Sequence, residues 1–199
     1  MLAVGAHPDD LELGCGATLA KLVANGVQVR ALVLSEGLRG VDHAHDRCAE
    51  TAAALVSLGV TDIVQACLPD TEMHTMNSEL VRILEFHCEE FQPDRVYTMF
   101  KDDRHQDHRA VYEASIIAFR SVPQILSYET PSSWPNFMPV VFEFVEDFIE
   151  SKINALKLHI SQQQRTYMKE HQIRCNAQFR GHQVGLGSSE GFIPYKLVL

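Results

Sequence analysis

Short apolar segments alternate with longer segments of helical periodicity along the first two thirds of the chain, and this alternation constrains the fold more than any other feature. Runs rich in apolar and β-branched residues predict five strands, at residues 2–6, 28–34, 62–66, 95–100 and 124–128. Helical spacing predicts four helices between them, at residues 14–25, 46–58, 78–91 and 107–120. Strands and helices that alternate in this way form a mostly parallel sheet with helices on both faces and right-handed crossovers. We therefore expect a Rossmann-like, three-layer α/β/α fold that forms a single domain over residues 1–199.

The last third of the chain has a less regular pattern. A proline-rich loop around Trp134 and Phe137 precedes a predicted strand at 140–144. Apolar residues at helical spacing then predict one long amphipathic helix at 146–164, and the glycine-rich segment 181–191 is expected to be a loop near the active face. The apolar loop around Trp134 lines a substrate, forms an oligomer contact or packs on the protein's own core, and the sequence leaves these alternatives open.

Composition excludes several classes of partner. Hydrophobic residues make up 46% and charged residues 22% of the 199 residues, so the chain can bury a core of its own. The formal net charge is -9 and no basic face is visible, whereas binding to nucleic acid requires clustered Lys and Arg. No apolar run approaches the ~20 residues that a membrane-spanning helix needs. We expect a small-molecule partner, with no nucleic acid and no membrane insertion.

Cysteine usage and the first residues of the chain bear on its location. The cysteines are odd in number, scattered and free of CxxC pairs: Cys15, Cys48, Cys67, Cys88 and Cys175. This distribution is typical of reduced, buried thiols rather than of a disulfide framework. The chain reaches Asp9 and Asp10 too soon for a secretory signal peptide. We expect a cytoplasmic protein.

A histidine and two carboxylates, His7, Asp9 and Asp10, directly follow the first predicted strand. In open α/β sheets, ligands bind beyond the carboxyl ends of the strands, which is where these side chains fall. The alternative to a binding site is a structural role, in which Asp9 or Asp10 caps the next helix and His7 is a partly buried histidine. Three such residues within four positions favour a binding site.

A second polar cluster at 101–108 directly follows the fourth predicted strand. His105 and His108 lie three residues apart, so a helical turn would place them on one face. The alternative is a charged loop capped by Asp107. Together, the two clusters offer imidazole and carboxylate groups, and zinc commonly takes a few such ligands and keeps one position open for water at catalytic sites. The two clusters therefore favour a catalytic metal site, and none of the cysteines belongs to it.

Several motifs together resemble the PIG-L/LmbE-type de-N-acetylase family, which includes deacetylases of mycothiol, bacillithiol, glycolipid-anchor and antibiotic biosynthesis. The motifs are AHPDD near the N terminus, LxLGCGATLAK in the first helix and HQDH after the fourth strand. Lesser matches extend to SEGF at 189–192, so the resemblance covers essentially the whole chain. It implies the LmbE-like fold and a zinc-dependent hydrolase. The hydrolase would remove the acetyl group from an N-acetylglucosamine-like sugar, free or conjugated, and a homo-oligomer is plausible.

The resemblance also implies roles for individual residues. The family's metal ligands match His7, Asp10 and His108. Zinc is the expected metal, although another divalent ion such as Fe²⁺ tolerates the same ligands. Asp9 matches the general base, which takes a proton from the attacking water. His105 matches a histidine that stabilises the oxyanion and protonates the leaving amine, and Asp107 matches the carboxylate that orients it.

Three further residues match positions that face the crevice in the family and are expected to contact substrate: Arg47, Asp70 and Glu190. Arg47 has an alternative partner in Glu50, one helical turn along the chain, and Glu190 has an alternative role as a brace for its loop.

Two other functions remain as alternatives. The same catalytic groups would serve a hydrolase of a different amide or ester, because they do not encode the acyl group. A non-catalytic nucleotide-binding module is the remote alternative, suggested by the glycines at 14 and 16. Leu19 breaks that fingerprint, and the acidic turn at 9–10 would repel a pyrophosphate. The sequence does not name the sugar or the pathway.

Overall fold

The computed structural model describes residues 1–39 and 45–199. Its strands form one seven-stranded sheet in the order β3-β2-β1-β4-β5-β7-β6. The strands are β1 (Leu2–Gly5), β2 (Arg30–Ser35), β3 (Asp62–Leu68), β4 (Arg95–Thr98), β5 (Gln124–Tyr128), β6 (Val141–Phe144) and β7 (Ser189–Leu197). The first five strands pair in parallel, whereas β7 runs antiparallel to both β5 and β6.

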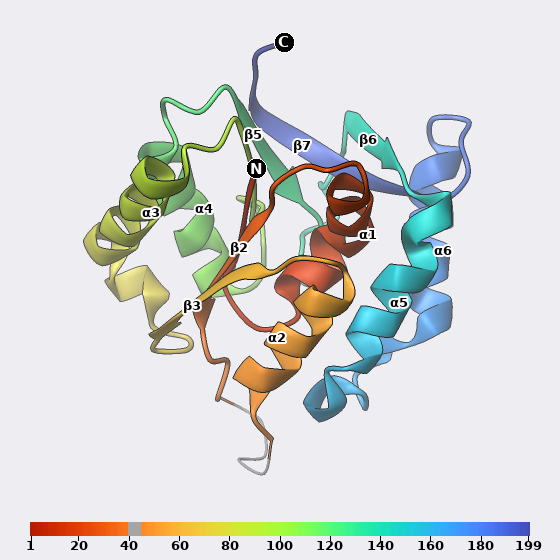
Figure 1. The fold of residues 1–199 in the computed structure, drawn as a ribbon, viewed down its shortest axis with the longest axis horizontal. Helices are drawn as coiled ribbons and strands as arrows, with labels where there is room; N and C mark the ends of the chain where they lie inside the picture. Colours follow the sequence, from red (N-terminus) through yellow and green to blue (C-terminus); the bar gives the residue numbers. More distant parts are fainter. Residues whose placement is uncertain (40–44) are drawn as a thin grey trace.

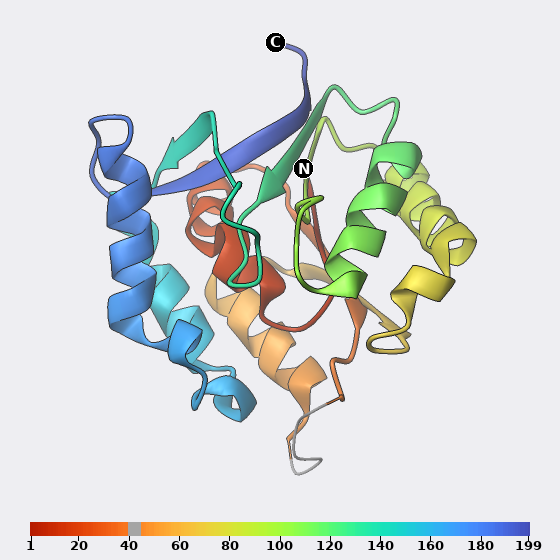
Figure 2. The same cartoon turned by 180° about the vertical axis from the view of Figure 1, so that it is seen from behind.

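Helices cover both faces of this sheet (Figures 1 and 2). Helices α3 and α4 pack together on one face, and α5 packs against both α1 and α2 on the other. The helices are α1 (Asp10–Ala24), α2 (Arg47–Ser57), α3 (Asn77–Phe91), α4 (Gln106–Ala118), α5 (Ile149–Lys157) and α6 (Glu170–His182). Four short 3-10 helices are η1 (Met73–Thr75), η2 (Glu146–Phe148), η3 (Ile160–Gln162) and η4 (Thr166–Met168). The predicted three-layer, mostly parallel α/β/α fold is confirmed.

The central strands are buried on both faces, as a parallel sheet between two helical layers requires. The side chains of Leu2, Ala3 and Val4 in β1 have no exposed surface. Strand β1 pairs with β2 on one side and with β4 on the other, so the strand order reverses direction between β1 and β4. Such a topological switch point opens a crevice at the carboxyl ends of the two strands.

The last third of the chain differs from the prediction. One continuous helix at 146–164 is wrong, because α5 covers only Ile149–Lys157 and His159 leaves the helical conformation. The His159 side chain turns inward and contacts Glu12 at 3.1 Å, and both side chains are fully buried. A loop over the whole of 181–191 is also wrong, since β7 begins at Ser189.

The sequence did not predict helix α6 or most of β7, and both omissions have physical reasons. The helix is largely polar and buries only four residues, so its hydrophobic periodicity is weak: Ile173, Ala177, Arg180 and Gly181. Strand β7 contains a glycine and Pro194, which are uncommon inside strands. Its antiparallel pairing with β5 and β6 accommodates both residues near the sheet edge.

The proline-rich loop packs in part on the core, which was one of its predicted roles. Phe137 is buried and its ring packs edge-on against Phe100, with centroids 5.0 Å apart, so this residue belongs to the core. Trp134 remains 53% exposed, and its backbone N–H donates to the Asp102 carbonyl.

Two findings concern membranes and thiols. Across residues 1–39 and 45–199, the helices are all too short or too polar to cross a membrane. All five cysteines lie in these ranges and carry free thiols. The prediction that they are buried holds for Cys15 and is wrong for Cys67 and Cys175, which are exposed.

Candidate metal centre

The turn between β1 and α1 supplies the first cluster of polar side chains. Asp9 adopts a left-handed backbone conformation, with φ of 83°, which a residue other than glycine rarely does outside turns and functional sites. It occupies the N-cap position of α1 without a capping hydrogen bond from its side chain. The Asp10 carboxylate instead accepts a hydrogen bond from the His7 backbone N–H at 2.7 Å. The capping role weighed for the aspartates is therefore absent.

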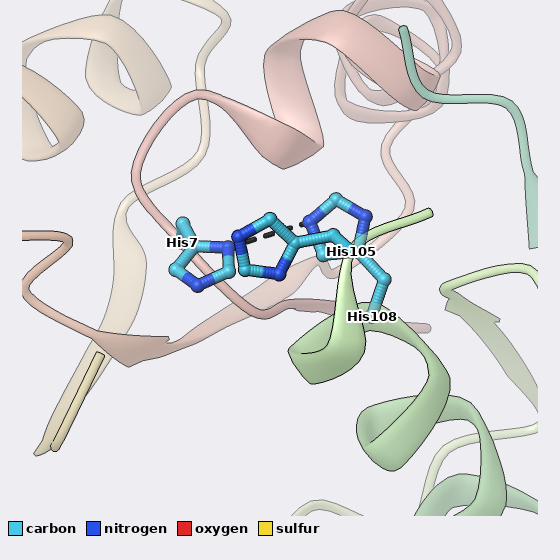
Figure 3. A group of neighbouring side chains, drawn as sticks. All are labelled: His7, His105 and His108. Atoms are coloured by element: carbon cyan, nitrogen blue, oxygen red, sulfur yellow. Dashed lines mark hydrogen bonds between the residues drawn. The ribbon is translucent and has the colours of Figure 1, made fainter. Parts of the chain in front are cut away.

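The start of α4 supplies the second cluster. His105 is the N-cap residue, and its Nδ1 accepts from the Asp107 backbone N–H at 3.3 Å. His108 lies in the first turn of the helix. Because β1 and β4 are parallel neighbours, the segments that follow them meet at the switch point of the sheet. Figure 3 shows His7 facing His105 and His108 at the start of α4.

Three side chains converge to within hydrogen-bond distance of one another. His7 Nδ1 lies 3.3 Å from His108 Nε2 and 3.5 Å from Asp10 Oδ2, and His108 Nε2 lies 3.3 Å from Asp10 Oδ1. Ligand atoms bound tetrahedrally to one zinc ion at about 2.0–2.2 Å lie roughly 3.3–3.6 Å apart. His7 Nδ1 and His108 Nε2 therefore have the spacing of two ligands of one metal ion, and the Asp10 carboxylate places one oxygen next to each of them.

Other donor atoms lie nearby. The imidazoles of His7, His105 and His108 place one nitrogen each within 4.8 Å of the others. Atoms of His7, Asp70 and Asp107 satisfy the same limit. Asp70 and Asp107 contact Nε2 of His7, the nitrogen opposite to the one that lies near His108.

Carboxylates hold the outward nitrogens of both imidazoles. His7 Nε2 lies 3.0 Å from Asp107 Oδ2 and 3.2 Å from Asp70 Oδ1. His108 Nδ1 lies 3.0 Å from Asp103 Oδ2. A carboxylate on the far nitrogen fixes the tautomer and orientation of a ligating histidine, and such partners are a regular part of metal sites.

The geometry departs from the role predicted for Asp107. Its carboxylate contacts His7 and accepts hydrogen bonds from the backbone N–H groups of Thr71 and Met73. It makes no recorded hydrogen bond to the His105 ring within the described ranges. The HxDH spacing places Asp107 one residue before His108 on a helix, and that position directs its side chain toward the β1 turn.

Arg47 lies beside Asp9 and not beside Glu50. Its guanidinium donates to Asp9 Oδ2 at 3.2 Å, to the Pro8 carbonyl at 2.8 Å and to the Gly37 carbonyl at 2.6 Å. Glu50 instead accepts hydrogen bonds from Ser161. Arg47 therefore positions the β1 turn and keeps a positive charge next to the Asp9 carboxylate.

Burial and neighbouring charges shift the pKa values of the two aspartates in opposite directions. Burial, followed by the negative charge of Asp10, raises the pKa of Asp9 to about 7, while Arg47 opposes this shift. Burial would also raise the pKa of Asp10, but His108 and His7 outweigh it and lower that pKa well below its usual range. Asp10 thus remains a carboxylate, whereas Asp9 is able to take up a proton near neutral pH.

The pKa values of the three histidines are shifted as well. Burial disfavours their charged forms, but hydrogen bonds to carboxylates raise the pKa of His7 well above its usual value. Asp10 and Asp103 likewise overcome burial and raise the pKa of His108 to about 9. Burial and then the charges of His7 and His108 lower the pKa of His105. Of the three histidines, His105 is the one that most readily gives up a proton.

A cavity of about 340 Å³ opens onto these side chains. It brings together most of the residues predicted for the site, including Arg47 and Asp70. Its walls also include residues that the sequence analysis did not single out: Arg39, Thr71, Arg104, Ser132, Gln162, Arg165 and Tyr167. Asp107 lies behind His7 and outside this lining.

Glu190 lies outside the lining of this cavity. Its carboxylate accepts hydrogen bonds from the backbone N–H groups of Ala17 and Thr18 and pairs with Lys152 at 2.7 Å. These N–H groups are available because α1 is interrupted at Cys15. Glu190 therefore braces α1 against β7, which was the alternative to substrate contact.

Asp103 was part of the cluster at 101–108 but received no role from sequence. It is fully buried and accepts hydrogen bonds from Thr130 and Ser132 as well as contacting His108. Its position in the polar segment that follows β4, five residues before His108, was the available signal. Glu12 and His159 form a further buried pair behind the turn, which no local pattern indicated.

Comparison with known proteins connects this geometry to a family. The family model described as PIG-L, GlcNAc-PI de-N-acetylase, matches residues 2–119. The uncharacterized deacetylase YaiS of Escherichia coli K12 is 47% identical over 167 residues, which are 81% of this chain and 90% of that protein.

Solved structures agree in fold. The conserved protein TT1542 from Thermus thermophilus superposes with a TM-score of 0.87 at 25% identity, covering 100% of this chain and 95% of that one. The N,N′-diacetylchitobiose deacetylase from Pyrococcus horikoshii gives a TM-score of 0.80 at 26% identity, covering 97% and 82%. The family match and the likeness to YaiS show that this chain belongs to the PIG-L family of deacetylases.

Proposed function

We propose that the protein is a zinc-dependent hydrolase that removes the acetyl group from an N-acetylated sugar of the N-acetylglucosamine type. The observation that carries this proposal is the convergence of His7 Nδ1, His108 Nε2 and the Asp10 carboxylate at 3.3–3.5 Å, with Asp9 beside them. Membership of a deacetylase family and the likeness to a diacetylchitobiose deacetylase support the choice of substrate.

The donor set fits zinc. His7, Asp10 and His108 would hold the ion, and two neutral imidazoles with one carboxylate leave it a formal charge of about +1. A bound zinc ion with this charge would polarise the substrate carbonyl and lower the pKa of water. Fe²⁺ accepts the same nitrogen and oxygen donors, so the identity of the native metal is part of the proposal.

Asp9 acts as the general base. An effective base has a pKa near the working pH, and that of Asp9 is about 7. Arg47 holds the carboxylate in place at 3.2 Å, so the oxygen that is not bound to Arg47 is available to take a proton from the attacking water.

His105 stabilises the oxyanion and delivers a proton to the leaving amine. Its ring lines the cavity, with its centroid 4.5 Å from that of His7 and 4.7 Å from that of His108. Burial and the charges of His7 and His108 lower the pKa of His105, so the ring is mostly neutral near pH 7 and takes up, in the course of the reaction, the proton that it passes to the amine. Asp107 acts on His7 in this scheme, because its carboxylate lies on that ring.

The sugar hydroxyls bind to polar groups on the cavity wall. Asp70 lines this wall together with Arg39 and Tyr167, and its carboxylate accepts a hydrogen bond from the Arg39 backbone N–H at 2.8 Å. Arg47 is buried and has its three recorded hydrogen bonds to protein atoms, so we assign it to the positioning of Asp9. The cytoplasmic location and the homo-oligomer remain predictions.

Acetate release tests the proposal. Purified protein would be stripped of metal, reloaded with zinc or Fe²⁺, and offered N-acetylglucosamine, N,N′-diacetylchitobiose, an acetate ester and an unrelated acetamide. We expect release from the sugars that depends on the metal and is lost in His7→Ala. Release from the ester or the unrelated acetamide alone would move the function to a different hydrolase, and the absence of any metal binding would reject the centre itself.

A further inference from the structure

The chain returns to the metal centre directly after α5, through residues 159–162. Two contacts fix this segment. His159 Nε2 lies 3.1 Å from Glu12 Oε1, and the backbone N–H and hydroxyl of Ser161 donate to the two carboxylate oxygens of Glu50 at 2.9 and 2.6 Å. The two glutamates lie in the first turns of α1 and α2. The segment is therefore tied to the two helices whose N termini border the candidate metal centre.

The fixed segment ends in Gln162, which lines the metal-centre cavity. The residue is only 3% exposed and shares the cavity wall with Asp9. Among the described residues that line this cavity, it is the only one with a carboxamide. The other polar groups are imidazoles, hydroxyls, three carboxylates and the guanidinium groups of Arg39, Arg47, Arg104 and Arg165. Gln162 lies outside residues 2–119, so the family match assigns it no role.

Ser161 determines which end of the Gln162 amide faces the cavity. The Glu50 carboxylate only accepts hydrogen bonds, so the Ser161 hydroxyl uses its proton on Glu50. Ser161 Oγ can then only accept from Gln162, and the amide nitrogen Nε2 lies 3.3 Å from it. This leaves Oε1 for a partner in the cavity, and it makes no recorded hydrogen bond within residues 1–39 and 45–199. Gln162 thus offers a neutral hydrogen-bond acceptor at the cavity wall.

A neutral acceptor at this place suits an N–H or O–H donor of the substrate. The four guanidinium groups only donate hydrogen bonds, so they cannot receive such a donor. The three carboxylates already have partners, because Asp9 pairs with Arg47 and the other two contact His7. An N-acetylated sugar supplies both kinds of donor, the acetamide N–H and the ring hydroxyls.

We propose that Gln162 is a substrate-binding residue, whose Oε1 accepts a hydrogen bond from the acetamide N–H or a hydroxyl of the N-acetylated sugar. The inference rests on the proposed function, because the sugar is the substrate proposed there. Gln162 makes no recorded contact with the three metal ligands in the described ranges. Loss of its acceptor should therefore weaken substrate binding and leave metal binding unchanged.

Steady-state kinetics of acetate release from N-acetylglucosamine tests the contact in the zinc-loaded protein. Gln162→Leu removes the acceptor at similar side-chain size, and we expect KM to rise about three- to tenfold, the range for one lost neutral hydrogen bond. The value of kcat should change little, because the contact holds the ground state and the transition state alike. The zinc Kd should not change. Gln164→Leu, an exposed glutamine outside the cavity lining, is the matched control and should keep KM. Gln162→Ala serves as the second variant if leucine prevents folding.

A competition experiment distinguishes the two donors. In 2-O-acetylglucose an ester oxygen replaces the N–H of N-acetylglucosamine, and its inhibition constant is compared between the wild-type protein and Gln162→Leu. If a hydroxyl is the donor, the variant should bind both compounds more weakly. If the acetamide N–H is the donor, the variant should bind only N-acetylglucosamine more weakly.

Binding without turnover separates this inference from the proposed function. Asp9→Asn lacks the proposed general base, so calorimetry with this variant measures the Kd of N-acetylglucosamine without hydrolysis. Adding Gln162→Leu should raise this Kd about three- to tenfold, whereas adding Gln164→Leu should not. Equal Kd values in the two double variants, or an unchanged KM in Gln162→Leu, would overturn the contact. Failure of the zinc-loaded wild-type protein to release acetate from any N-acetylated sugar would instead overturn the proposed function.

Discussion

The Asp107 carboxylate and the His7 imidazole meet at 3.0 Å, between Oδ2 and Nε2, and Asp107 is fully buried. A carboxylate accepts hydrogen bonds only, so the proton of a neutral His7 ring lies on Nε2. This leaves the Nδ1 lone pair directed at Asp10 and His108. A buried carboxylate thereby selects the tautomer that a metal at this centre needs.

Asp107→Asn should weaken metal binding without removing a ligand. The amide can donate to His7 Nε2 in competition with the Asp70 carboxylate, which would shift the ring proton toward Nδ1, the proposed ligand atom. Loss of such a partner typically lowers metal affinity about 10–100-fold. Competition with a chelator measures the zinc Kd. Asp147→Asn, an exposed aspartate in η2, is the control, and equal affinities in the two variants would contradict the tautomer argument.

Asp9→Asn should retain metal and lose turnover, whereas His7→Ala should lose both. Asparagine suits the left-handed backbone at position 9, where φ is 83°, so the turn should persist. Loss of a general base typically lowers kcat by about 10²–10⁴. Metal content by elemental analysis and acetate release together check this. Equal loss of metal in the two variants would reject the assigned division of roles.

Zinc binding should release protons and should weaken as pH falls. In the metal-free protein the pKa of His108 is about 9 and that of His7 is also raised, so both rings carry protons at neutral pH. A metal must displace them, and each displaced proton changes the apparent affinity by about tenfold per pH unit. Above about pH 9, the contribution of His108 should vanish. Calorimetry in buffers of different ionisation enthalpy counts the protons, and a pH-independent affinity with no proton release would contradict the assignment.

The sequence predicted that His7 and His108 would meet because that prediction needed only topology. His7 and His108 follow strands that a parallel sheet places side by side, and their convergence follows from the strand order. The partners of these rings depend on side-chain rotamers, which local patterns do not determine. Asp107 was therefore assigned to His105 although it contacts His7, and Asp103 received no role.

The less regular end of the fold was predicted poorly for a related reason. The ring of His159 is buried against Glu12, a contact across 147 residues that no local periodicity reports. Helix α6 is rich in polar residues and buries only four of its side chains, so it lacks a clear apolar stripe. The polar composition of this helix therefore left no periodic pattern from which the helix could be predicted.

Gly14→Ala should destabilise the protein, whereas Gly16→Ala should not. A Cβ at Gly14 would overlap the ring of Tyr128, which is fully buried and donates a hydrogen bond to the Val4 carbonyl at 2.8 Å. Neither the ring nor β1 has room to shift, so the substitution should lower the free energy of unfolding by roughly 3 kcal/mol, near the upper end for overpacked cores.

The neighbouring glycine supplies the control. A Cβ at Gly16 would meet only ordinary contacts, the nearest being Lys152 Cγ at 3.4 Å. Alanine there should be neutral or stabilise the protein by about 0.5–1 kcal/mol, because it restricts the unfolded chain. Urea unfolding of both variants measures the difference. Equal stability would mean that α1 is not seated against Tyr128. The turn between β1 and α1, which carries His7 and Asp9, would then lack support from the packing of α1 on Tyr128.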